Sequence, residues 1–205
     1  ESRAMAVVLN SPEEVGAFMV AAQDEPETDL PNHPLAQEAH QQHVRAMTAQ
    51  RNKRGPLLTE AIGKWSQIIE MGLSDSRDLA LALYHRGLSR LHLPTNQFKE
   101  ALQDADDALS ADATCSYAMV LRAQSLRGLE RFREALEQMK LYCEAQPDDA
   151  SGWQIAGQIA QNIDRLEGTS EAEAHFMKWA EMQLEPALSG EAKHLVYLSP
   201  SFHDL

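Results

Sequence analysis

The segment NQFKEALQDADDALSADA (residues 96–113) is followed by a near copy, ERFREALEQMKLYCEAQPDD (residues 130–149). Phe98-Lys99-Glu100-Ala101-Leu102 in the first matches Phe132-Arg133-Glu134-Ala135-Leu136 in the second, 34 residues later. In both copies the apolar residues recur at the spacing of one face of an α-helix. Since the copy stands at a fixed distance, the helix is predicted to belong to a repeated structural unit.

The segments that precede the two copies also correspond. LALALYHRGLSRLHL (79–93) aligns with SYAMVLRAQSLRGL (116–129), and each carries an arginine followed by a small residue, Arg86-Gly87 and Arg122-Ala123. A small residue midway along a helix allows a neighbouring helix to approach closely. Each unit is therefore predicted to be a pair of helices.

Two further units are predicted, one on each side. The downstream unit has a first helix over residues 151–163, containing the small residue Gly157, and a second helix over residues 170–182. The upstream unit has a first helix over residues 34–53, containing the small residue Ala49, a turn at Gly55-Pro56 and a second helix over residues 57–72. The matching alanines, Ala61, Ala101, Ala135 and Ala172, are 40, 34 and 37 residues apart. These differences in spacing fall in the turns, where insertions cost little.

This pattern resembles the tetratricopeptide repeat (TPR) family, whose 34-residue unit is a helix–turn–helix. The resemblance rests on the paired segments, on small residues such as Gly87 and Ala101, and on Pro147 after a second helix. It covers roughly residues 40–184. It implies an all-α fold in which three to four antiparallel helix pairs stack into a right-handed superhelix with capping helices at both ends. The alternative is an unrelated helical bundle.

Three parts of the chain are distinguished. Residues 1–33 are predicted to hold a short amphipathic helix and an acidic, proline-rich linker, residues 34–188 the repeat domain, and residues 189–205 a capping helix and tail. The N-terminal helix is expected to cap the first repeat; the alternatives are that it lies in the groove or meets a partner. Because the chain begins at Glu1, we expect a trimmed or processed form in which a native targeting signal would not be visible.

Composition limits the classes of partner. Of the 205 residues, 43% are apolar and 24% charged, which is ordinary for a globular protein, and the formal net charge is −13. So negative a surface repels phosphate backbones, and no apolar run reaches the ~18 residues that span a bilayer. We therefore expect neither a nucleic acid nor a membrane as partner.

The two cysteines, Cys115 and Cys143, show no metal-ligand spacing and fit a reducing compartment, so a cytoplasmic location is expected. An antiparallel helix pair would bring them near each other. A disulfide is therefore left open, although two free thiols are favoured.

Catalytic and metal-binding patterns are missing from the sequence. It contains no GxSxG, P-loop, GxGxxG or HExxH motif, and His40 with His43, or His85 with His92, are expected to be polar surface residues. We predict no enzymatic activity, no metal and no cofactor.

The resemblance implies that a ligand contacts the inner face of each first helix. The expected partner-binding residues are Gln50, Lys53, Tyr84, His85, Leu88, Tyr117, Gln124, Arg127, Gln154 and Gln158. None is acidic, whereas acidic residues gather on the second helices, and amide side chains can bond a ligand backbone. The sequence thus favours a neutral-to-basic groove in an acidic exterior.

The predicted function is a non-enzymatic protein–protein interaction module, an adaptor or scaffold that binds a peptide or helix in the groove. One alternative is a regulatory or assembly domain of a larger enzyme, such as a prolyl isomerase or phosphatase. Another is a co-chaperone that binds chaperone C-terminal tails. In the family, that clamp uses cationic side chains, and the matching positions here read Ala46, Gln50, His85, Tyr117 and Leu121, none permanently positive. The sequence does not predict an oligomeric state.

Overall fold

The computed structural model describes residues 30–188, and within this range every element of regular secondary structure is a helix. In chain order the elements are η1 (Leu30–Asn32), α2 (Pro34–Thr48), α3 (Arg51–Glu70), α4 (Ser76–Leu91), α5 (Phe98–Ala111), α6 (Ser116–Gly128), α7 (Phe132–Ala145), α8 (Ala150–Glu167) and α9 (Glu171–Leu188). The segments at 1–29 and 189–205, which include the predicted N-terminal helix and C-terminal cap, lie outside the described residues.

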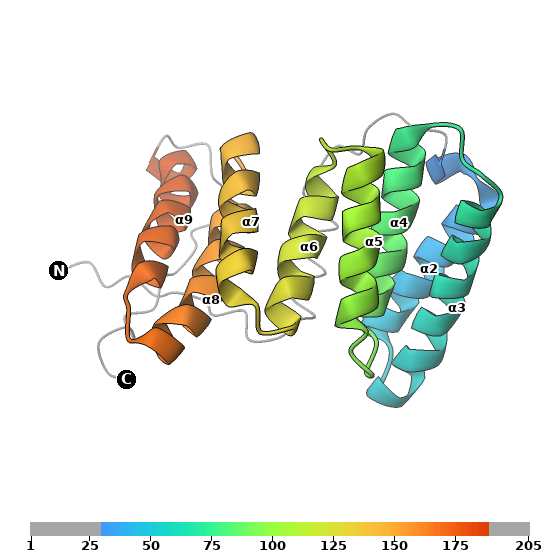
Figure 1. The fold of residues 1–205 in the computed structure, drawn as a ribbon, viewed down its shortest axis with the longest axis horizontal. Helices are drawn as coiled ribbons and strands as arrows, with labels where there is room; N and C mark the ends of the chain where they lie inside the picture. Colours follow the sequence, from blue (N-terminus) through green and yellow to red (C-terminus); the bar gives the residue numbers. More distant parts are fainter. Residues whose placement is uncertain (1–29, 189–205) are drawn as a thin grey trace.

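Successive helix pairs follow one another along the long axis of the molecule, from α2/α3 at one end to α8/α9 at the other (Figure 1). Each α-helix packs on the next one along the chain, and α4 also packs against both α2 and α6. The predicted fold class, an all-α stack of adjacent helix pairs, is confirmed. Such a stack buries the apolar stripe of each pair against its neighbours.

The repeat is also visible in the backbone of the turns. Asn96 and Glu130, which precede the second helices of two successive pairs, both have a left-handed backbone, with φ of 51° and 60°. They stand 34 residues apart, so the same turn recurs at the period of the sequence repeat. Asp75 and Asp149 cap the first helices α4 and α8 by accepting hydrogen bonds from Arg77 N (2.7 Å) and Ser151 N (2.9 Å).

Glycines stand where neighbouring helices come closest. A Cβ atom at Gly87 of α4 would lie 2.6 Å from Leu121 Cδ2 of α6 and 3.0 Å from Asp104 Cβ of α5. In the last pair, a Cβ atom at Gly157 would lie 2.8 Å from the Phe176 ring. The role predicted for small residues, close helix approach, is therefore confirmed at both positions.

A buried ion pair joins the two helices of the second pair. The Asp104 carboxylate on α5 is only 1% exposed and lies 2.6 Å from Arg86 Nη2 and 2.7 Å from Arg90 Nη1, both on α4. The two guanidinium groups offset part of the cost of removing this carboxylate from water, although burial still raises the pKa of Asp104.

The upstream boundary prediction was wrong. The first helix does not continue to residue 53, because Ala49 and Gln50 are extended (ψ of 155° and 147°) and separate α2 from α3. Arg54 Nε donates to the Ala46 carbonyl at 3.2 Å and so satisfies the end of α2. Gly55 and Pro56 lie inside α3 instead of forming the turn.

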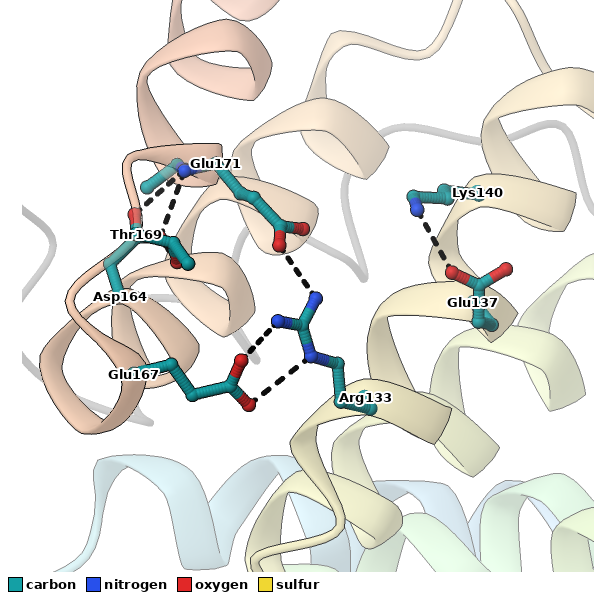
Figure 2. Close-up of polar contacts among 8 residues, drawn as sticks. Arg133, Glu137, Lys140, Asp164, Glu167, Thr169 and Glu171 are labelled. Carbon is teal, nitrogen blue, oxygen red and sulfur yellow. Dashed lines mark hydrogen bonds and ion pairs between the residues drawn. The ribbon is translucent and has the colours of Figure 1, made fainter.

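Polar contacts at the end of the stack hold the turn between α8 and α9 (Figure 2). Asp164 of α8 accepts hydrogen bonds from Glu171 N at 2.8 Å and Ala172 N at 2.9 Å, and also from the Thr169 hydroxyl. Arg133 of α7 reaches across to carboxylates on both sides of the turn, Glu167 and Glu171. Asp164 therefore acts as the N-terminal cap of α9 from seven residues away.

Candidate functional site

Side chains of the first helices connect neighbouring pairs, beginning with an aromatic contact between α4 and α6. The rings of Tyr84 and Tyr117 lie 5.3 Å apart, and Leu88 packs in the same apolar cluster. Tyr84 and Leu88 are only 5% and 7% exposed, whereas Tyr117 is half-buried. Of these three predicted binding residues, Tyr117 has the accessible surface that a ligand would need.

Between α6 and α8 the connection is polar. Arg127 Nη1 donates to Gln158 Oε1 at 3.2 Å, and Asn162 Nδ2 donates to the backbone oxygen of Gln158 at 2.9 Å. Arg127 is half-buried, and burial lowers the pKa of its guanidinium, which nevertheless stays charged at neutral pH. Among the side chains described between residues 32 and 182, no carboxylate forms an ion pair with Arg127, although carboxylates bind Arg86, Arg122 and Arg133.

The remaining amides differ in accessibility. Gln154 stands one turn before Gln158 on α8 and is half-buried, whereas Gln124 of α6 is 8% exposed. We name the accessible set the first-helix face, and it consists of Tyr117, Arg127, Gln154 and Gln158. Tyr117 and Arg127 are on α6, Gln154 and Gln158 are on α8, and Arg127 contacts Gln158.

Two predicted binding residues lie elsewhere. Gln50 is at the junction between α2 and α3, and Lys53 is in the first turn of α3. Both are exposed. Because the first helix ends at Thr48, the reasoning that placed these two side chains on its inner face does not hold.

The prediction of surface histidines was wrong for His43, which is 7% exposed. His40, His85 and His92 are half-buried, and the His85 ring stacks on Trp65 with centroids 4.8 Å apart and an interplanar angle of 10°. His40 and His92 complete the group, each packed against a histidine of the other helix. Sequence reasoning treated α2 and α4 separately and missed Trp65 and Ser89 as neighbours. The sequence held one indication of this contact, because both histidine pairs are on the inner faces of consecutive first helices.

The four histidines do not form a metal centre. Across the described part of the chain, no group of three or more histidine, cysteine or acidic residues is arranged to hold a metal ion. Cys115 and Cys143 are buried free thiols in separate apolar clusters, and burial raises the pKa of Cys143 to about 12. Such a thiol is a poor nucleophile near neutral pH.

Charge is divided between the two helices of a pair. In the pair α6/α7, the first helix α6 contains no acidic residue, whereas the second helix α7 contains Glu134, Glu137 and Glu144. None of the helices between residues 30 and 188 combines the length and hydrophobicity needed to span a bilayer.

No protein-family model matches the sequence, and no curated protein sequence matches it. Among solved structures, the fold is similar to that in the crystal structure of MamA protein, with a TM-score of 0.56. The match covers 77% of this chain and 79% of the MamA chain, with 16% sequence identity. At this identity the similarity is one of fold: both chains have the same overall helical architecture.

Proposed function

We propose that this chain is a non-enzymatic, TPR-like interaction module that holds an extended or helical segment of another protein along the first-helix face. The observation that carries the proposal is Arg127. It is a half-buried cation on a helix without acidic residues, it donates a hydrogen bond to an amide oxygen, and none of the carboxylates described between residues 32 and 182 pairs with it.

A desolvated guanidinium with several N–H donors gains most from an additional acceptor oxygen. The neighbouring amides Gln154 and Gln158 can both donate to and accept from a ligand backbone, which does not require a particular ligand sequence. The first-helix face therefore suits a polypeptide segment that presents an acceptor oxygen to Arg127.

Binding to chaperone tails receives no such support. Two of the positions that match the family's clamp, Ala46 and Leu121, are 0% and 1% exposed and apolar. They cannot supply the cations that would hold two carboxylates.

The test is to identify a partner by affinity capture, isolate its bound segment and measure its dissociation constant by calorimetry. We expect Arg127→Gln to weaken binding about 10- to 100-fold, the loss of one charge-assisted hydrogen bond of ~1.5–3 kcal/mol. The matched control is Arg133→Gln, an exposed arginine on α7, which should change affinity less than about 2-fold. Equal effects in the two variants, with both folded, would refute the proposal.

A further inference from the structure

Four histidines gather where the first helix pair meets α4, and we name this cluster the histidine junction: His40 and His43 of α2, His85 of α4, and His92 at the C-cap of α4. The ring centroids of His43 and His92 are 5.4 Å apart, and those of His40 and His85 are 5.9 Å apart. The cluster bridges two helix pairs, so its charge acts directly on the contact between them.

Hydrogen bonding defines the protonation of His43. The fully buried Ser89 hydroxyl donates to the His85 carbonyl at 2.9 Å, and its oxygen also lies 2.9 Å from His43 Nδ1. Since the hydroxyl has one proton, His43 Nδ1 must carry the hydrogen and donate to Ser89. A neutral His43 then has no proton on Nε2, and acid would add one there.

The second member of this pair, His92, is poorly solvated. Its Nδ1 is buried and has no hydrogen-bond partner among the described residues. His85 stacks on Trp65, and burial, followed by the charge of His40, lowers its pKa to about 3. The rings of His43 and His92 are in contact with each other, so a positive charge on either one also raises the cost of charging the other.

The surrounding charges do not offset protonation. Burial, followed by the charges of His92, His85 and His40, lowers the pKa of His43 to about 3. Burial, followed by Arg54 of α3, lowers the pKa of His92 to about 4.

Other elements that pack against α4 add no free carboxylate at this contact. On α5, Asp104 is bound by two arginines of α4. The titratable group that α6 presents is Tyr117, which contacts Tyr84, and η1 carries no titratable side chain.

We propose that the histidine junction is an acid-sensitive switch, in which protonation of His43 and His92 separates the first helix pair, α2/α3, from α4. Separation would uncover the apolar cluster that includes Trp65 and Leu81. Because stability in stacked repeats is a sum over neighbouring units, α5 to α9 would remain assembled. Helices α5, α6 and α7 contain no histidine, so they provide an internal reference.

The direction with pH follows from proton binding. In the separated state the two imidazoles titrate near 6.5, whereas the closed state binds their protons only near pH 3 to 4. Separation therefore increases as the pH falls below about 6.5, by up to about 10-fold per pH unit for each histidine.

The test is amide hydrogen exchange on the full chain at pH 7.5 and pH 5.5, corrected for intrinsic exchange rates. We expect protection of α2 and α3 to fall by at least ~100-fold, from about 10-fold for each of His43 and His92 with a further contribution from His85, while α6 and α7 change little. A parallel loss in both regions, or no loss in α2 and α3, would overturn the proposal.

The variant His43→Gln/His92→Gln should reduce this difference by about 100-fold and leave only the contribution of His85, whereas His175→Gln on α9 should leave the difference in place. Full pH dependence in the double variant would contradict the proposal. If the double variant does not fold, imidazole proton resonances of the wild type decide. Titration of His43 and His92 near pH 6.5 with α2 and α3 still protected would also overturn it.

Discussion

Gly87 offers the sharpest test of how closely the helix pairs stack. A methyl group at this position would lie 2.6 Å from Leu121 Cδ2, 3.0 Å from Asp104 Cβ and 3.4 Å from the Ala101 carbonyl oxygen. Leu121 is 1% exposed, and Asp104 is held by two arginines, so neither can move aside freely. The Gly87→Ala variant must therefore shift α4 relative to α5 and α6.

The expected magnitude combines two opposing effects. Overpacking typically costs ~1–3 kcal/mol. Replacing glycine by alanine inside a helix contributes about 0.5–1 kcal/mol of stability in return. We expect Gly87→Ala to lower the free energy of unfolding by about 1–2 kcal/mol.

The matched control is Gly63→Ala on α3, where an added Cβ atom has nothing within 4 Å. This variant should raise the free energy of unfolding by about 0.5–1 kcal/mol. Urea unfolding followed by helical circular dichroism measures both, and the slopes show whether the transition stays cooperative. If Gly87→Ala is as stable as Gly63→Ala, α4 does not approach its neighbours as closely as described.

Three further substitutions test individual contacts by the same unfolding measurement. Glu130→Asn should stabilise the chain by about 0.5 kcal/mol, because asparagine tolerates the left-handed backbone at φ 60° better than glutamate; a destabilisation would contradict this. Asp164→Ala should cost ~1–2 kcal/mol, since two backbone N–H groups of the α8–α9 turn lose their acceptor. Asp104→Ala should cost ~3–5 kcal/mol by leaving two arginines unpaired, and a cost below ~1 kcal/mol would show that water already compensates them.

Much of the order of the helices could be predicted because the repeat appears in the sequence itself, as a recurring spacing of apolar and small residues. The copies around Ala101 and Ala135 correctly predict α5 and α7. The small residues Gly87 and Gly157 lie at close contacts between helices, as their size predicts. Such positions are recognisable because both the period and the residue size are present in the sequence.

The first pair was harder to predict, because its boundary depends on a contact between helices. Gly55-Pro56 has the composition of a turn, yet Pro56 is tolerated early in α3. The actual break is at Ala49-Gln50, where the Arg54 guanidinium donates a hydrogen bond to the Ala46 carbonyl near the end of α2. No local rule marks that break.

The candidate site was likewise predictable in its local features but not in those that depend on contacts between helices. Residue type and helical spacing could identify Tyr84 and Leu88 as inward-facing, but not that both are almost fully buried in the stack. Exposure depends on how far neighbouring pairs overlap, which is a property of the tertiary structure. The histidine junction was missed for the same reason, because its members come from two pairs.

The central claim, that a partner lies along the first helices, is tested most directly by photo-cross-linking in cells. A benzophenone amino acid is placed at Gln154 on the first-helix face or, as control, at Leu141, which is 56% exposed on the second helix α7. The account predicts that Gln154 captures a discrete partner, that Leu141 does not, and that Arg127→Gln strongly reduces the capture. Cross-links to that partner from Leu141 alone, or equal capture from both positions, would contradict it.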